Sequence, residues 1–410
     1  MAGLRVLIGE HITLVTDRPA RDGDGVDDLP RVFDEAFSDW CRHYAIAPVG
    51  LESWRAFGCL VVDRDRFRKA GLLPDTLPDF SNGFCDRNRL WMMDQTNPAY
   101  RRHLLLHEGV HAFTISVRDL DAPAWYTEGI AELLATHRLE PGADGTGDFI
   151  ATPVPIAAAD VEQLGRIEAI RRLRAADSMP GLDDVFAAPG NAHGDMTLYA
   201  SSWAVVALLS LHPRYAAAFA AAERGPLDRE FTARMQRVDG WDGDTAARDF
   251  DAFTDDIDYG YDFSRSAVEW AAGTPLEAVC DVRVVADRGW QNSGARLERR
   301  RRYSLQATGR VTVGKIAAGR HGEPSSNRLL EAEPTGISLE WYRGRPVGRL
   351  LAAQWVDPGG GGRPSFVVLA EAATGEFRAM VDGPLFFKVN ESPGDLADNV
   401  GEFQVKVGPH

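Results

Sequence analysis

The spacing of two histidines and a glutamate constrains this chain more than any other stretch. His107 and His111 are four residues apart, so on a helix both imidazoles project from the same face. Glu108 follows His107 directly, which places a carboxylate beside the two imidazoles. Two imidazoles in this arrangement can bind zinc, and the carboxylate can take a proton from a metal-held water. The run predicts a metal site on a helix that starts at Asn97 and Pro98, with Asn as the N-cap.

A third metal ligand is expected from a second helix. The segment from Ala124 to Arg138 reads as helical and contains Glu128, which follows His111 by seventeen residues. Glu132 lies one turn further along and shares a face with Glu128. The expected ligands are the two histidines of the first helix and Glu128. His103, one turn before the first of these histidines, is expected to play a supporting role because better ligands follow it.

Together these residues resemble the gluzincins, the thermolysin-like and aminopeptidase-like branch of zinc metallopeptidases. The resemblance implies that His107, His111 and Glu128 bind Zn²⁺ and that Glu108 is the general base. It also implies that Glu132 hydrogen-bonds His107 and orients it. The implied activity is hydrolysis of peptide bonds in a peptide or protein substrate.

Two further features narrow the resemblance. The pattern from Trp125 to Glu132 is similar to that of exported bacterial members of the group. The metzincin class is excluded, because it needs Gly and His where this chain has Thr114 and Val117.

The resemblance also implies a residue that stabilises the oxyanion of the tetrahedral intermediate. Gluzincins place a Tyr or a His for this purpose in the lobe that follows the metal site. Tyr199 is the first candidate because it opens a helix after a Gly- and Asn-rich loop, and His193 within that loop is the rival. The alternative for Tyr199 is a core aromatic, and the alternative for His193 is an exposed loop residue.

The segments around the metal helix show alternating and helical patterns. A sheet is expected beside the metal helix, with an edge strand lining the cleft where it could hold an extended peptide. The strands predicted before this helix are Ile12–Thr16, Arg55–Asp63 and Phe84–Asp94, and Leu29–Tyr44 is predicted as an amphipathic helix. The later predictions are helices at Ala157–Ala176 and Leu198–Arg224, and a solvated surface segment with a short helix at Asp239–Asp262.

From about Glu277 the sequence changes to short strand-like runs separated by Gly, Pro and Asn. This pattern of short strands and turns predicts an antiparallel β-sandwich. The predicted strands are Val282–Ala286, Arg302–Ala307, Arg310–Val313, Leu339–Tyr342, Phe366–Ala370, Leu385–Val389 and Phe403–Val407.

The loop from Asn390 to Gly401 carries oxygen-bearing side chains at short intervals, which suits calcium. It resembles the calcium loop of the small galactose-binding bacterial lectins, and the resemblance extends over roughly residues 290–407. On that resemblance the calcium ligands are Glu391, Asp395, Asp398 and Asn399. Glu391 and Asp398 depart from the residues usual in the lectins, and the lectins' sugar-contacting loop has no counterpart near Gly322–Pro334. Calcium binding is expected, carbohydrate binding is left open, and the alternative is a turn without metal.

Composition excludes several partners. The net charge of −15 argues against nucleic acid or an anionic membrane as the main partner, because both call for basic surfaces. No apolar run approaches the length of a membrane span. The N-terminal residues do not read as a signal peptide, so the chain is expected to be cytoplasmic by default, although the gluzincin resemblance suggests export.

The expected fold class is α+β, with a zincin-like metallopeptidase domain at 1–270 and a lectin-like calcium-binding β-sandwich at 277–410. The N-terminal domain is expected to have an α/β part up to about residue 96 and a helical part after it. Two functions follow from different classes. One is a zinc peptidase with Glu108 as general base. The other is an inactive zincin scaffold that serves as a calcium-dependent carbohydrate- or partner-binding protein.

Overall fold

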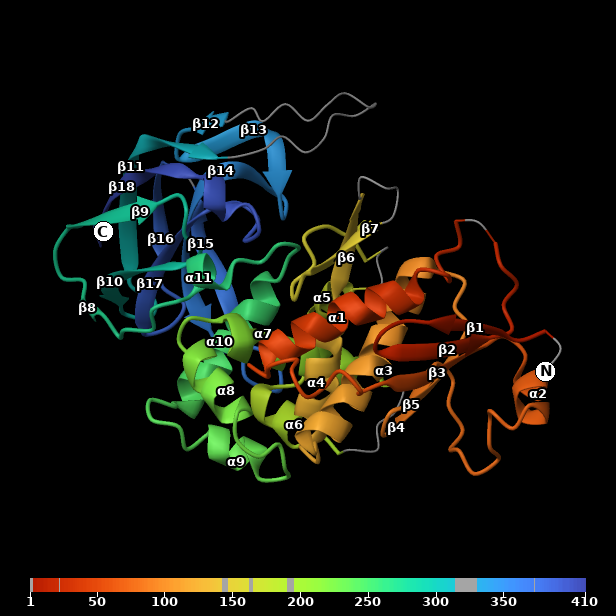
Figure 1. The fold of residues 1–410 in the computed structure, drawn as a ribbon. Helices are drawn as coiled ribbons and strands as arrows, with labels where there is room; N and C mark the ends of the chain where they lie inside the picture. The colour runs from red at the N-terminus through yellow and green to blue at the C-terminus, as the bar shows by residue number, and fades with distance from the viewer. Residues whose placement is uncertain are drawn as a thin grey trace. The chain divides into compact units, whose positions relative to one another are not determined.

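A five-stranded sheet forms the N-terminal part of the chain in the computed structural model (Figure 1). The structure describes residues 3–21, 23–141, 147–161, 165–189, 195–313, 330–371 and 373–410. The strand order is β1-β2-β3-β5-β4, with parallel pairing from β2 to β5 and antiparallel pairing at both edges. The strands are β1 (Arg5–Ile8), β2 (Ile12–Thr16), β3 (Ala56–Val61), β4 (Gly83–Asp86) and β5 (Arg89–Met93).

The single strand expected at Phe84–Asp94 is wrong, because the structure has a hairpin there. The chain turns at Arg87, whose φ is 54°, and Asp86 pairs with Arg89 across the two-residue turn. A run of strand-forming residues that contains such a turn folds back on itself instead of continuing. The strand β4 thereby becomes one edge of the sheet.

Two helices pack on this sheet, and a third packs on those two helices. They are α1 (Leu29–His43), α3 (Pro98–Arg118) and α4 (Ala124–Ala135). The Oδ1 atom of Asn97 accepts the backbone N–H of Tyr100 at 2.9 Å, so the predicted N-cap is confirmed. Helix α3 packs on β4, β5, α1 and α4, and Figure 1 shows α3 running alongside the sheet. Helix α4 ends three residues before the predicted Arg138, which belongs to a strand.

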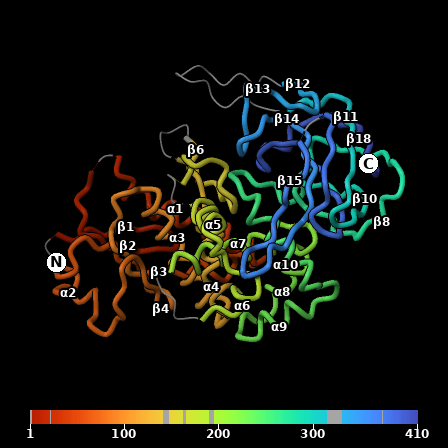
Figure 2. The backbone as a smooth tube through the Cα atoms, turned by 180° about the vertical axis from the view of Figure 1, so that it is seen from behind, coloured from red at the N-terminus to blue at the C-terminus, as the bar shows by residue number. Residues whose placement is uncertain are grey.

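The other elements before residue 242 are helices shorter than α3 and one pair of strands. The helix expected from Ala157 begins only at Arg166, and the one expected from Leu198 is broken after Leu211 into two helices. Figure 2 shows α3, α4 and α7 close together when the chain is seen from behind. The elements are α2 (Arg64–Lys69), β6 (His137–Pro141), β7 (Gly147–Ala151), α5 (Arg166–Ala175), α6 (Leu182–Phe186), α7 (Met196–Leu211), α8 (Ala216–Glu223) and α9 (Phe231–Met235).

The C-terminal part contains two larger sheets, so the chain is α+β. One has the order β13-β14-β17-β10-β8 with β15 paired to β14, and the other has the order β12-β11-β18-β9 with β16 paired to β11. Buried side chains from both sheets, such as Phe387 and Phe403, share one apolar core. The elements are α10 (Gly243–Asp256), α11 (Phe263–Ser266), β8 (Thr274–Pro275), β9 (Cys280–Val285), β10 (Gln291–Leu297), β11 (Arg302–Val313), β12 (Leu330–Ala332), β13 (Thr335–Tyr342), β14 (Arg345–Val356), β15 (Ser365–Glu371), β16 (Thr374–Arg378), β17 (Gly383–Val389), the 3-10 turn Leu396–Asp398 and β18 (Val400–Pro409).

Contacts divide the chain into two units that do not follow the sequence in one cut. The first unit comprises Met1–Ile170, Leu182–Ser210 and Arg214–Trp241, and the second comprises Arg171–Gly181, Leu211–Pro213 and Asp242–His410. Helix α10 therefore groups with the C-terminal sheets and not with α3. The boundary expected at residues 270–277 remains a proposal, and this grouping favours a cut near residue 242.

The segment Asp239–Asp262 is not the solvated stretch that its acidity suggested. Asp251 and Asp256 on α10 are buried, and each faces a cation from the same unit. Asp251 accepts two N–H groups of Arg363 at 2.9 and 2.6 Å, and Asp256 pairs with Lys388 and Arg343. Buried carboxylates persist because these cations neutralise them, a pairing that local sequence does not reveal.

Length and composition allow none of the described helices to cross a membrane by itself. Helices α7 and α8 would qualify only as a pair, and they are bent by 106° at their junction.

Candidate metal centre

Helix α3 presents His107, Glu108 and His111, and all three side chains are buried. The Nε2 atoms of the two histidines lie 3.1 Å apart, with the rings at 84° to each other. The four-residue spacing on one helix face brings these atoms together, as the sequence predicted.

Helix α4 brings Glu128 to the same point. Its Oε2 atom lies 3.4 Å from Nε2 of His107 and 3.5 Å from Nε2 of His111. A tetrahedral ion with bonds of about 2.0–2.2 Å holds its ligand atoms roughly 3.3–3.5 Å apart. The three atoms are therefore spaced as if around such an ion. Among the described residues, Glu128 Oε2 is also a buried oxygen without a hydrogen-bond partner, so a metal would satisfy it.

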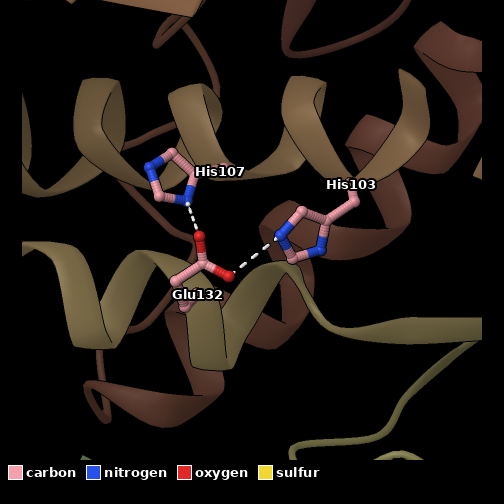
Figure 3. A group of neighbouring side chains, drawn as sticks. All are labelled: His103, His107 and Glu132. Carbon is pink, nitrogen blue, oxygen red and sulfur yellow. Dashed lines mark hydrogen bonds and ion pairs between the residues drawn. The ribbon is translucent and has the colours of Figure 1, made fainter. Parts of the chain in front are cut away.

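Glu132, one turn further along α4, contacts the helix of the histidines (Figure 3). Its Oε1 atom is 3.2 Å from Nδ1 of His107, and its Oε2 atom is 3.1 Å from Nε2 of His103. An Nδ1 atom that faces a carboxylate oxygen carries the proton, because two lone pairs would repel. With a metal ion bound between Glu128 and His111, the Nε2 atom of His107 would offer its lone pair to that ion.

Carboxylates surround this centre and favour positive charge in it. Burial opposes the charged form of His107, but Glu128 and Glu132 raise its pKa to about 10. Burial likewise opposes ionisation of Glu128, yet the two histidines lower the pKa of its carboxyl far below the ordinary value. The pKa of Glu132 is also lowered well below normal against burial, by Arg166 and His103. A cation among these groups is electrostatically favoured.

Two groups of three residues could hold a metal ion in the described part of the chain. One is His107, His111 and Glu128, and the other is His103, His107 and Glu132. In the second group Glu132 already faces a cation. Arg166 donates from Nε to Oε2 at 2.7 Å and from its terminal nitrogen to Oε1 at 2.5 Å. The first group is thus the better metal site.

A cavity of about 180 Å³ opens beside these residues. It is lined by one face of α3, which includes His107 and Glu108, and by residues 79–83 at the start of β4. Glu132 of α4, Arg166 of α5 and the start of α7 with Tyr199 complete the lining. The Tyr199 ring lies edge-on to His107, with the ring centres 5.9 Å apart. The structure brings Tyr199 to the candidate site, whereas His193 lies outside the described residues.

Strand β4 lies directly against Glu108. A Cβ atom placed on Gly83 would be only 2.2 Å from the Oε1 atom of Glu108 and 2.8 Å from its carboxyl carbon. Glycine is the residue that permits this approach. The edge of the sheet therefore borders the carboxylate.

The predicted calcium residues share one loop in the second unit. Glu391 is buried, and its Oε2 atom accepts from the side-chain amide of Asn399 at 2.6 Å. Burial, with Asp395 and Asp398 adding and Asn399 opposing, raises the pKa of Glu391 to about 8. Among the described residues this loop does not form a group of three His, Cys, Asp or Glu close enough to share an ion. Calcium binding here stays a prediction.

Sequence reasoning missed Arg166 altogether. It is a buried arginine that bonds Glu132 and lies against Tyr199, with its guanidinium carbon 5.6 Å from the ring centre. Nothing in the local sequence distinguishes it from the arginines that follow it in α5, because its partner is 34 residues away.

Comparisons with known proteins give only weak neighbours. No family model matches the chain, and no curated protein matches its sequence. A solved structure described as the EclA N-terminal domain, a PllA-like lectin, is 20% identical, with a TM-score of 0.22, over 33% of this chain and 98% of its own. The IMPa metallopeptidase in complex with T-antigen is 12% identical, with a TM-score of 0.15, over 89% of this chain and 38% of its own. Scores this low carry no argument about function.

Proposed function

We propose that the chain is a zinc-dependent peptidase. The observation that carries the proposal is the spacing of Nε2 of His107, Nε2 of His111 and Oε2 of Glu128 at 3.1–3.5 Å, with a buried and unsatisfied oxygen among them. Two imidazoles and a carboxylate are a common protein donor set for catalytic zinc, which keeps its fourth position for water or substrate.

Each residue around the centre has a distinct role in the proposed hydrolysis. Zinc bound there would lower the pKa of its water and polarise a carbonyl oxygen. Glu108 accepts the proton of the attacking water and returns it to the leaving amine. Tyr199 donates a hydrogen bond to the oxygen on which negative charge develops. Glu132 holds His107 with its Nε2 lone pair directed at the metal.

The substrate of the proposed reaction is an extended polypeptide. In the described part of the chain, β4 pairs only with β5, so its other edge is free to accept main-chain hydrogen bonds. A peptide that adds to this edge passes Glu108, because Gly83 of β4 touches that carboxylate. The finer fold assignment belongs to this proposal: a zincin-like domain followed by a lectin-like β-sandwich.

Metal analysis combined with a peptide screen tests the function. Protein purified without added metal should contain about one zinc per chain and cleave members of a pooled peptide library. His111→Ala should lose the zinc, because one of three protein ligands is gone. Glu108→Gln should keep the zinc and lose hydrolysis, because an amide cannot accept the proton. Glu52→Gln, the same change at an exposed position, is the control.

The result separates the two classes of function. Stoichiometric zinc without cleavage of any peptide would favour the inactive scaffold that binds a carbohydrate or a protein partner. Zinc retained by His111→Ala would contradict the ligand assignment. Hydrolysis at the wild-type rate by Glu108→Gln would remove Glu108 from the mechanism.

We also propose a calcium site formed by Glu391, Asp395, Asp398 and Asn399. The supporting observation is that Glu391 is buried in the same loop as Asp395 and Asp398. Burial is the main reason that its pKa is raised, and the two aspartates add to it, so a cation bound in the loop would favour the ionised carboxylate. Calcium added to the full chain after treatment with a calcium-selective chelator, at saturating zinc, should raise the melting temperature. Replacing both Asp395 and Asp398 by Ala should abolish this rise. A melt insensitive to calcium in the wild type would reduce the loop to a turn.

A further inference from the structure

The carboxylate of Glu132 is fully engaged on both oxygens. Oε1 faces Nδ1 of His107 and a terminal nitrogen of Arg166, and Oε2 faces Nε2 of His103 and Nε of Arg166. A carboxylate offers about four lone-pair positions, and four nitrogens lie within 3.2 Å of the two oxygens. The side chain of Glu132 is 2% exposed, so no position is left for solvent.

Without Arg166 the same residues would resemble a second metal site. His103, His107 and Glu132 offer one ligand atom each within 4.8 Å of one another. Figure 3 shows Glu132 between the two histidines, with one oxygen directed at each. This second group shares His107 with the proposed zinc site through the opposite ring nitrogen.

Arg166 has the position and the surroundings of a resident cation. Its relative exposure is 9%, and its guanidinium meets Glu132 with two parallel N–H bonds, the strongest geometry for this pair. The guanidinium of Arg166 also lies near the ring of Tyr199. Its remaining terminal nitrogen contacts the sulfur of Met196 at 3.7 Å. A metal ion bound to Glu132 would have to displace the guanidinium of Arg166 or lie beside it. Two positive charges on one carboxylate repel each other strongly.

We propose that the guanidinium of Arg166 is a built-in cation that occupies the second His–Glu group, so that the chain binds one metal ion instead of two. It keeps Glu132 an acceptor, which holds the proton of His107 on Nδ1 and leaves Nε2 for zinc. Arg166 is thus a positioning residue for the metal centre. This inference rests on the proposed zinc site.

Zinc stoichiometry at a series of buffered free-zinc concentrations tests the inference. The wild type and Arg166→Lys, which keeps the charge, should bind one zinc per chain even at saturation. Arg166→Met, which keeps the length and loses the charge, should bind a second zinc. It should also bind the first zinc about ten- to a hundredfold more weakly, because Glu132 no longer fixes His107. Arg172→Met, at an exposed position of the same helix, is the matched control.

A second substitution identifies where the additional metal binds. His103→Ala combined with Arg166→Met should return the stoichiometry to one, because the second group then loses a ligand. Cobalt substitution gives an independent signal, since the visible absorbance of Arg166→Met should contain a second component that the double variant lacks. Circular dichroism confirms that each variant is folded.

The outcomes separate this inference from the function on which it rests. A wild type that binds no zinc overturns the proposed function. A wild type that binds two leaves the peptidase proposal intact and overturns the role of Arg166. A folded Arg166→Met with one zinc at wild-type affinity also overturns it. If that variant does not fold, Arg166→Gln takes its place, and the wild-type stoichiometry remains decisive.

Discussion

At the level of single residues, the centre depends on close contacts that tolerate little added volume. Gly83 is the clearest case, because a Cβ atom there would lie only 2.2 Å from the Oε1 atom of Glu108. A side chain there would push the carboxylate away from the position that the structure gives it. Small displacements of a catalytic group are costly, since a shift of about 1 Å can reduce the rate about a hundredfold.

Gly83→Ala should therefore retain zinc and lose most of the hydrolytic rate. We expect kcat/KM to fall by about tenfold to a hundredfold, because the new methyl group displaces the general base and leaves the metal ligands in place. Gly375→Ala is the control, since a Cβ there meets open space. Equal rates for the two variants would show that Glu108 accommodates the methyl group without cost.

His137 links stability to pH without being a metal ligand. Burial lowers its pKa to about 4, the hydrogen bond with Ala135 opposing this shift and the charge of Arg102 adding to it. Nδ1 bonds the carbonyl of Ala135, and Arg102 donates to Nε2 at 3.3 Å, so the neutral ring is satisfied. The unfolded chain binds a proton below pH 6.5 and the folded chain only near pH 4. Stability is thus present above pH 6.5 and declines as the pH falls between these values.

His137→Gln should flatten this decline. Urea unfolding measured with a metal chelator at pH 7 and at pH 5 should show a larger loss of unfolding free energy for the wild type than for the variant. The chelator keeps the proposed zinc site empty at both pH values, so that loss of metal in acid does not contribute to the difference. A pH dependence identical in both proteins would mean that His137 does not remain neutral in the fold.

The sequence predicted the candidate ligands and Glu132 because these residues lie on two continuous helices, but it did not predict two residues that reach the site from other elements. His107, Glu108 and His111 are fixed relative to one another by helical geometry alone. Their distance from Glu128 depends on how α3 packs on α4. Sequence spacing suggests this packing but does not determine it. Arg166 and Gly83 act through packing and could not be inferred.

At the level of elements, helix α4 is positioned by its contact with α7. A Cβ on Gly129 would lie 2.4 Å from the backbone oxygen of Ser202 and 2.6 Å from Val206. Backbone atoms cannot move aside as a side-chain end can. The glycine next to Glu128 thus sets the distance between the helix that carries this ligand and its neighbour.

Gly129→Ala should loosen both packing and metal binding. Separating the helices should lower the free energy of unfolding by about 1–3 kcal/mol, measured by urea titration of the zinc-free protein. Zinc affinity should fall as well, because Glu128 moves with α4. Unchanged values of both quantities would show that α7 yields to the methyl group.

The strands illustrate how tertiary context overrides local preference. Strand β17 (Gly383–Val389) was predicted as Leu385–Val389, two residues short at its start, because its apolar residues are continuous and lie between turns. Strand β14, the longest together with β11, was not predicted. Its run Leu350–Gln354 consists of good helix formers, and only pairing with β13, β15 and β17 fixes it as a strand.

At the level of the whole molecule, the second unit begins earlier than composition suggested. Lys388 and Arg343 from the sheets are paired with Asp256 of α10. Lys388 is 2% exposed. A chain cut at Glu277 would leave this buried cation without its carboxylate, and breaking such a pair costs about 3–5 kcal/mol.

A fragment from Asp242 to His410 should therefore melt at a higher temperature than one from Glu277 to His410. Calorimetry of the two fragments at equal concentration measures the difference. In the longer fragment Asp256→Asn should reproduce much of this loss of stability, because it removes the charge that neutralises Lys388. Equal melting temperatures of the two fragments would return the domain boundary to about residue 277.

The open edge of β4 also bears on solubility. An edge that accepts a substrate strand accepts a strand of another copy equally well, and long, flat edges of this kind promote aggregation. Here the edge strand has only four residues, it starts at a glycine and it ends at Asp86 beside a turn. An edge of four residues offers too few hydrogen bonds for a lasting sheet between molecules, and the proposed peptide substrate would be held there only briefly.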